Sequence, residues 1–170
     1  MSDPDDWIRG VVEQFSGPLT LYTLHLLGNL EQARDVVQET FIKLCAQRRD
    51  AIEPKLKYWL YLVCRNAAFD LLRKEKHMTP LTDAHEPASE SATADEALEG
   101  TGQADMLRAL EALPPNQREV IRLKFLHGQS YREISQLTSL SESNIGFLIH
   151  TGLKTLRRRL AGHDLKSNTL

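Results

Sequence analysis

Apolar residues recur at intervals of three and four along most of the 170-residue chain, a spacing typical of amphipathic α-helices. Alternating runs rich in Val, Ile and Thr, which would predict strands, are nearly absent. The first half of the chain is predicted to form helices over residues 5–27, 31–48 and 55–77, with Gly28 ending the first. The third helix has an apolar stripe that is expected to face a core: Leu56, Trp59, Leu60, Val63, Ala67 and Leu71.

A second block of helices is predicted over residues 104–161. Pro114 and Pro115 are expected to end its first helix, because proline cannot continue a helix that precedes it. Asn116 is predicted to cap the next helix, and Gly128 is predicted to end it.

The last two helices of this block have the layout of a helix-turn-helix. Ser130 and Glu133 match a capping box that begins the first of them. Ser141 is expected to cap the last helix, which should end near residue 160. A short turn sets the steep angle at which such a helix enters a DNA major groove. The predicted seam between the two helices comprises Ile134, Leu137, Leu140, Ile145, Ile149 and Leu153.

The outward face of the last helix carries candidate DNA contacts. Ser143, Phe147, His150 and Lys154 share this face, because they are spaced by four, three and four residues. The arginines at residues 157–159 suit phosphates, which position a protein without specifying sequence. Two alternatives remain open. The hairpin could pack against another protein, and Phe147 could be a core residue rather than an apolar contact to a thymine methyl group.

Between the two blocks, residues 79–102 are rich in Ala, Ser, Thr, Glu and Asp. Their few apolar side chains cannot offset the entropy of ordering, so we expect a flexible acidic linker. The predicted fold is all-α, with two small helical domains at residues 1–78 and 103–162 and a tail at residues 163–170. The second domain is predicted to be a four-helix domain that contains the helix-turn-helix.

The formal net charge of −2 conceals a segregation of charge along the chain. Residues 1–50 carry −3, residues 51–81 carry +3, residues 82–102 carry −6 and residues 103–170 carry +4. Two basic segments, suited to nucleic acid, are therefore separated by an acidic one.

Several classes of protein are not supported. No apolar run approaches the roughly 18 residues of a membrane span, and the first six residues have three Asp and no basic residue, unlike a signal peptide. Cys45 and Cys64 are isolated, which favours packing in a reducing cytosol over a disulfide or zinc site. We find no catalytic grouping of Ser, His, Asp or Cys, so we expect no enzymatic activity, metal or cofactor. An adaptor without DNA function is disfavoured by the arginines at residues 157–159.

Two helices of the first block carry polar faces. Asp35, Gln38 and Glu39 lie at i, i+3 and i+4 and share one face. The next helix combines aromatic and basic residues, as proteins do to hold unstacked bases and their phosphates. Its aromatic residues are Tyr58, Trp59, Tyr61 and Phe69, of which Trp59 and Phe69 could instead be core. Its polar face comprises Asn66, Asp70, Arg73 and His77.

Three ordered motifs resemble the minimal, two-domain RNA polymerase sigma factors of the extracytoplasmic-function class. DVVQETFIKL resembles the region-two signature that docks on the polymerase clamp. YWLYLVCRNAAFDLLRKEK resembles the segment that reads and melts the promoter −10 element. ALEALPPNQREVIRLKFLHGQSYREISQLTSLSESNI resembles region four, which reads the −35 element. The resemblance covers about residues 15–160.

The resemblance implies a cytoplasmic transcription initiation factor whose partners are core RNA polymerase, promoter DNA and an anti-sigma factor. Contacts to the clamp of the largest subunit are expected from Asp35, Gln38, Glu39 and Lys43. The loop at residues 50–57 would hold a base flipped from the −10 element. Contacts to the −10 element are expected from Tyr58, Tyr61, Asn66, Asp70, Arg73, Lys74 and Lys76. Contacts to the −35 element are expected from Arg132, Ser143, Asn144, Gly146, Phe147, His150, Thr151, Lys154 and Arg157.

The chain departs from the family pattern on the last helix. The family often has basic residues where this chain has Gly146, Leu148 and Thr151, and often has Gly where this chain has Ser139. Losing those cations weakens attraction to phosphate and guanine readout, so we expect a non-standard −35 site. The alternative function is a helix-turn-helix repressor or activator that dimerises through its N-terminal block. Such a protein would retard duplex DNA by itself.

Overall fold

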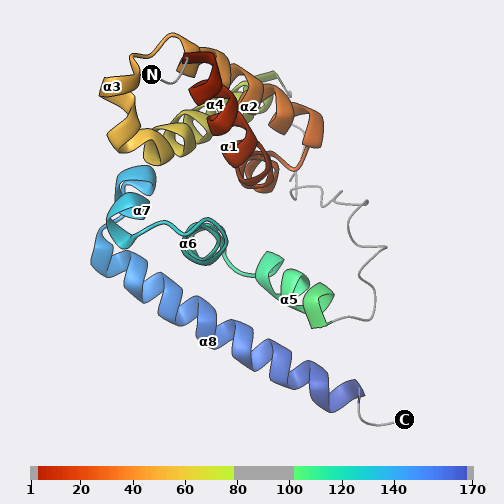
Figure 1. The fold of residues 1–170 in the computed structure, drawn as a ribbon. Coiled ribbons are helices and arrows are strands. Elements are labelled where there is room, and N and C mark those ends of the chain that lie inside the picture. Colours follow the sequence, from red (N-terminus) through yellow and green to blue (C-terminus); the bar gives the residue numbers. More distant parts are fainter. Residues whose placement is uncertain (1–3, 79–101, 168–170) are drawn as a thin grey trace. The chain divides into compact units, whose positions relative to one another are not determined.

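The computed structural model of the protein describes residues 4–78 and 102–167, and the regular elements within these ranges are all helical (Figure 1). The chain divides into two compact units, Met1–Ser91 and Ala92–Leu170. The predicted all-α class is confirmed over the described ranges. Apart from Gly102, which begins a helix, the predicted linker lies outside the described residues.

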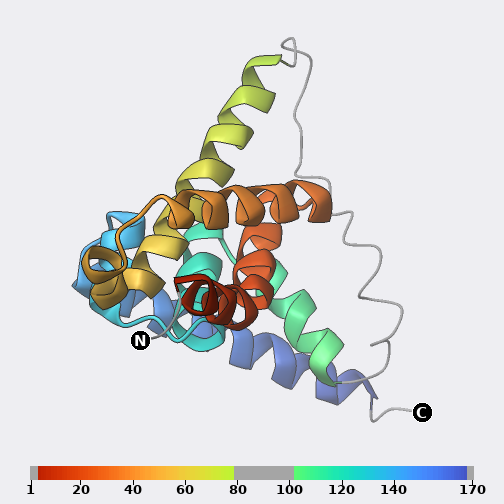
Figure 2. The ribbon, with the colours of Figure 1, turned by 45° about the horizontal axis from the view of Figure 1, so that its top comes forward.

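Three long helices build the first unit: α1 (Pro4–Leu27), α2 (Leu30–Cys45) and α4 (Leu56–Met78). Between α2 and α4 lie the short helix α3 (Arg49–Ile52) and a 3₁₀ turn, Glu53–Lys55. Helix α1 packs against α2 and α4, which also pack against each other. Figure 2 shows the C-terminal part of α4 extending beyond the other two helices, which leaves it open to a partner.

Local chemistry sets the ends of α1 and α2. Gly28 adopts a φ of 71° and ends α1 as predicted, because glycine enters the left-handed region without a steric penalty. Asn29 caps α2 by accepting a 3.0 Å hydrogen bond from the N–H of Gln32. Helix α2 ends at Cys45, short of the predicted end, because Gln47 donates to a carbonyl three residues back and closes a tight final turn.

The core of the first unit lies where the three long helices meet. The rings of Tyr22 on α1 and Tyr61 on α4 pack at a tilt, with centroids 5.2 Å apart. Leu60 is the only fully buried member of the predicted apolar stripe of α4. The buried side of the helix is therefore rotated away from the predicted stripe. The buried residues of α4 are Leu60, Tyr61, Cys64 and Ala68.

Cys64 occupies the centre of this core. Its Sγ lies 3.3 Å from Oγ1 of Thr40 on α2, and the two atoms share a hydrogen bond. Burial raises the pKa of the Cys64 thiol, and its hydrogen bond to Thr40 opposes this rise only in part. Cys45 is exposed, so both cysteines are free but differ in environment.

We expect the two thiols to react at very different rates in the native protein. Cys45 should react with Ellman's reagent at once. Cys64 should react only as fast as the first unit unfolds, because it is buried and its pKa is raised. Cys45→Ser should remove the fast phase and Cys64→Ser should retain it. Two comparable fast phases would contradict the burial of Cys64.

The described part of the second unit contains four α-helices, and α8 packs against the other three. They are α5 (Gly102–Glu111), α6 (Pro115–Ile121), α7 (Tyr131–Thr138) and α8 (Glu142–Ser167), and α6 continues into a π-helical turn over Arg122–Leu126. The predicted four-helix architecture with a helix-turn-helix is therefore present, with α7 and α8 as its two helices.

Two predicted boundaries of this unit differ from the structure, and the predicted end at Gly128 is confirmed. Pro115 is the first residue of α6 and Asn116 lies inside the helix, so Asn116 is not the cap. Proline suits this first position because its missing N–H would have had no partner. Gly128, with a φ of 59°, ends this helical segment as predicted, although the last turn before it is π-helical. Helix α8 continues to Ser167, so it includes part of the predicted tail at residues 163–170.

An ion-pair network joins α5 to α6. Arg122 is 5% exposed and pairs with the carboxylate of Glu111. Arg118 donates to the same carboxylate at 3.0 Å and to the carbonyl oxygen of Leu113 at 3.0 Å. Burial lowers the pKa of Arg122, and the charge of Glu111 counteracts this. Because an unpaired buried cation is costly, the network holds α5 and α6 in one arrangement.

Candidate nucleic-acid interface

The turn between α7 and α8 determines how α8 is presented. Ser130 and Glu133 form the predicted capping box: the N–H of Ser130 lies 2.6 Å from Glu133 Oε2, and the N–H of Glu133 lies 3.2 Å from Ser130 Oγ. Ser139 ends α7 in the left-handed region, with a φ of 61°. Ser141 then accepts a 3.1 Å hydrogen bond from the N–H of Asn144, which confirms it as the cap of α8.

The predicted seam between α7 and α8 is correct in most of its members. Ile134, Leu137, Ile145 and Ile149 are buried, while Leu140 and Leu153 are half-buried at its margins. This burial directs the opposite side of α8 outward. The exposed residues on that side are Ser143, Asn144, Phe147, His150, Lys154 and Arg157, whereas Gly146 and Thr151 are half-buried.

Phe147 is an outward-facing residue, not a core residue. Its side chain is 65% exposed, and it lies on the opposite side of α8 from Ile145 and Ile149. The alternative that placed Phe147 in the core is therefore wrong. An exposed aromatic residue on this face is available for contact with a partner.

Gly146 and Gly152 of α8 differ in the space around them. A Cβ at Gly152 would lie 2.5 Å from Cδ1 of Ile121, so this glycine allows α8 to approach α6 closely. A Cβ at Gly146 would meet only the ring of Tyr131, at an ordinary 3.7 Å. Gly146 is therefore compatible with a side chain, and packing does not account for its presence.

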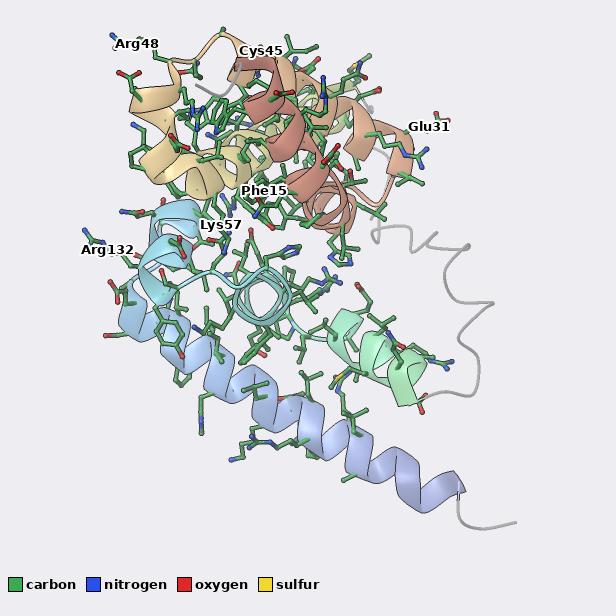
Figure 3. All side chains as sticks on the ribbon, in the orientation of Figure 1. Phe15, Glu31, Cys45, Arg48, Lys57 and Arg132 are labelled. Atoms are coloured by element: carbon green, nitrogen blue, oxygen red, sulfur yellow. The ribbon has the colours of Figure 1, made fainter. Side chains whose placement is uncertain are left out.

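Two residues that the sequence reasoning missed lie beside this face. Tyr131 begins α7 and is exposed, and the Nζ of Lys124 lies 5.2 Å from the centroid of its ring. The neighbouring Arg132 is also exposed and points outward from α7 (Figure 3). The sequence LKFLHGQSYR contains both Lys124 and Tyr131. Their contact could have been predicted only if the turn between them were known.

A second candidate surface lies along α4. A hollow of about 500 Å³ is lined by Arg65, Asn66, Phe69, Asp70 and Arg73. The guanidinium of Arg65 lies 4.5 Å from the ring centroid of Phe69, and Arg73 pairs with Asp70. Three of the predicted −10 contacts, Asn66, Asp70 and Arg73, therefore lie together beside an aromatic ring.

The remaining predicted −10 contacts on α4 have three outcomes. Lys74 and Lys76 are exposed near the C-terminal end of α4. Tyr58 is half-buried. Tyr61 is 2% exposed against Tyr22, so its prediction as a DNA contact is wrong. Burial also raises the pKa of Tyr61, as expected for a phenol in a core.

The polar face of α2 is exposed as predicted. Asp35, Gln38, Glu39 and Lys43 all have exposed side chains. Ile42 follows them at helical spacing, and its side chain is 63% exposed. The sequence reasoning did not identify this exposed apolar residue on an otherwise polar face.

The segment between α2 and α4 is more ordered than predicted. Residues 50–57 were expected to form a loop, but they lie in α3, the 3₁₀ turn and the start of α4. Arg49 bonds both carboxylate oxygens of Glu53 at 3.2 and 3.3 Å, and its guanidinium lies 5.3 Å from the ring centroid of Trp7. Arg48, which extends outward in Figure 3, bonds Asp50 at 2.6 Å. These contacts hold the segment between α2 and α4 in a defined conformation.

Two further searches were negative within the described ranges. No group of three or more His, Cys, Asp or Glu side chains there could hold a metal ion. Among the helices described, none combines the length and the apolar character that a membrane crossing requires.

Comparison with known families connects these surfaces. Residues 11–78, which include α2 and α4, match sigma-70 region 2. Residues 103–156, which include the helix-turn-helix, match sigma-70 region 4. The chain belongs to the extracytoplasmic-function (ECF) class of RNA polymerase sigma factors. It is therefore a transcription initiation factor that directs the polymerase to promoters.

Similar sigma factors extend across nearly the whole chain. RNA polymerase sigma factor CarQ of Myxococcus xanthus is 27% identical over 147 residues, which cover 85% of this chain and 84% of CarQ. ECF sigma factor SigM of Bacillus subtilis is 25% identical over 151 residues, which cover 88% and 93% of the two chains. The fold resembles that of sigma factor RpoE in its complex with anti-sigma factor NepR from Bartonella quintana, with a TM-score of 0.60, 22% identity and coverage of 90% and 96%.

Two serines of the turn should respond oppositely to substitution. Ser139→Gly should raise the free energy of unfolding of this sigma factor by about 0.5–1 kcal/mol, because glycine removes the left-handed strain. Ser141→Ala should lower it by about 1 kcal/mol, because the N–H of Asn144 loses its acceptor. Urea unfolding followed by circular dichroism measures both. Destabilisation by Ser139→Gly would show that the φ of Ser139 is not strained.

Proposed function

We propose that this sigma factor uses three surfaces on its two units, one to bind core RNA polymerase and two to bind the promoter. The first unit binds core RNA polymerase through α2 and the −10 element through α4, and the second unit binds the −35 element through α8. The observation that carries this assignment is the helical register. On each of the three helices, one side is buried and most of the residues that resemble family contacts are exposed on another. The exceptions are Tyr61, which is buried, and Tyr58, Gly146 and Thr151, which are half-buried. The proposed domains are residues 1–78 and 103–162.

The α2 surface fits a protein partner better than DNA. Its exposed side chains include two carboxylates, Asp35 and Glu39, which would repel phosphate. Ile42 supplies an apolar centre, and Lys43 supplies a cation at its edge. Charged contacts around a desolvated apolar residue are typical of specific interfaces between proteins. The proposed occupant is the coiled coil of the polymerase clamp.

The α4 surface fits unstacked DNA. The hollow beside Phe69 offers an amide from Asn66 and a carboxylate from Asp70, groups that can bond base edges. Arg73, Lys74 and Lys76 are exposed and can reach phosphates, although Arg73 must first leave its pair with Asp70. Capture of unstacked bases here would favour the melted promoter.

The proposal requires no catalysis by the sigma factor itself. Promoter melting would be driven by binding, because contacts to −10 and −35 through one polymerase-bound chain multiply their affinities through effective concentration. The proposed setting is the cytoplasm. An anti-sigma factor is also proposed as a partner, as the family resemblance implies and as NepR is for RpoE.

Core binding and promoter-specific transcription test the proposal together. Purified protein with core polymerase should give discrete run-off transcripts from a promoter library. Changing Asp35, Gln38 and Glu39 together to Ala should weaken core binding by about tenfold or more, because three exposed polar contacts are lost. The matched control changes Glu13 and Gln14, which are exposed on α1, to Ala and should leave core affinity unchanged.

Two outcomes would count against this assignment. An unchanged core affinity of the triple variant would place the clamp contact elsewhere on the first unit. Neither core binding nor a discrete transcript from the parent protein would reject the function itself. Retardation of duplex DNA by the protein alone would favour a repressor or activator instead.

Two variants of α4 should separate positioning from base readout. Lys76→Ala should weaken holoenzyme binding about equally on all −10 sequences and reduce the salt slope by about one, because it removes one phosphate contact. Asn66→Ala should cost roughly 1–3 kcal/mol on the preferred sequence and relax the preference at one position. Filter binding of promoter variants at several salt concentrations measures both. A uniform loss for Asn66→Ala would contradict base readout.

A further inference from the structure

The DNA-facing part of α8 carries an unusual set of side chains. From Glu142 to Leu153 there is no Lys or Arg, and the first cation of the helix is Lys154. Arg and Lys are the side chains that make bidentate contacts to guanine O6 and N7, the commonest specific contact in the major groove. The exposed first turns of α8 therefore lack the usual means of reading guanine.

The same surface carries an aromatic side chain instead. Phe147 is 65% exposed and stands between Ser143, one turn before it, and His150, one turn after it. Gly146 adds no side chain on one flank, and Thr151 lies one turn further along on the other. The centre of the reading face is therefore apolar, and the ring of Tyr131 lies on the flank beside Gly146.

The length of this face suits a short base-pair sequence. Ser143 and His150 are separated by about 10 Å along the helix axis, which corresponds to about three base pairs. Lys154 and Arg157 follow on the exposed side, where they can contact phosphate. Phe147 would thus lie over the middle of about three base pairs, and the cations would lie outside them.

The chemistry that fits an apolar centre in the major groove is the 5-methyl group of thymine. Thymine is the only standard base that presents a methyl group there, and Phe and Thr are among the side chains that contact it. We propose that α8 reads the −35 element through a thymine methyl group packed on Phe147 beside the Thr151 methyl, in place of guanine contacts. This inference rests on the proposed function of α8 as the −35 reader.

The first experiment identifies the base. Holoenzyme formed from the full chain and core polymerase is used to select templates from a library randomised at −35, and we expect an invariant A·T pair at one central position. Replacing that thymine by uracil removes only the methyl group. Binding should fall by about fourfold, the effect of one buried methyl-sized group. Uracil in the spacer, as the control site, should have no effect.

The second experiment assigns the methyl contact to Phe147. Phe147→Ala should weaken binding of the selected promoter by roughly tenfold and bind the thymine and uracil templates equally. The matched control is Phe125→Ala, which removes a Phe that is 58% exposed outside α8 and should retain the fourfold preference. Because both side chains are exposed, neither change should unfold the protein, as circular dichroism would confirm.

Three results would overturn the inference. These are selection of an invariant central guanine whose 7-deaza analogue weakens binding, equal binding of thymine and uracil templates by the parent protein, and retention of the thymine preference by Phe147→Ala. Each of these leaves the proposed function standing, because promoter-specific binding persists. Loss of all promoter specificity in the parent protein would instead reject the proposed function itself.

Discussion

The burial of Ile145 and Ile149 on one side of α8 is the constraint on which the proposed DNA-reading face depends. An α-helix turns by 100° per residue, so this buried side directs Ser143, Phe147 and His150 outward. The capping box and the left-handed Ser139 maintain the angle at which the seam can close. Other components of the second unit then act by holding α8 in place, including Gly152, which admits α6 closely.

Much of this arrangement could be predicted because its causes are local. The capping box at Ser130 and Glu133, the cap at Ser141 and the end of α1 at Gly28 each follow from side-chain or backbone chemistry within a few residues. The seam was predictable because apolar and polar residues on α7 and α8 are cleanly segregated. The polar face of α2 could be identified for the same reason, and its side chains are exposed.

The sequence-based predictions fail where tertiary packing decides which of several similar faces of a helix is buried. Helix α4 has apolar or aromatic residues on several sides, and the ring of Tyr22 on α1 selects the side that contains Tyr61. No pattern within α4 could show that choice, so Tyr61 was assigned to DNA. Ile42 was missed for a related reason, because an isolated apolar residue in a helix is usually buried, whereas here the register leaves it exposed.

On α8, the basic residues that could attract phosphate are separate from the side chains proposed to recognise bases. Its cations begin at Lys154, beyond the face centred on Phe147, so in the proposed function contacts to phosphate and contacts to bases would come from different turns. Fewer cations over the bases mean weaker binding to any sequence, and the second unit alone should have little affinity for DNA. Recognition of the −35 element by α8, as proposed, would then depend on polymerase, which would raise the effective concentration of α8 at the promoter. A weak but selective reader is an advantage in this position, because it contributes discrimination without retaining the protein on non-specific DNA.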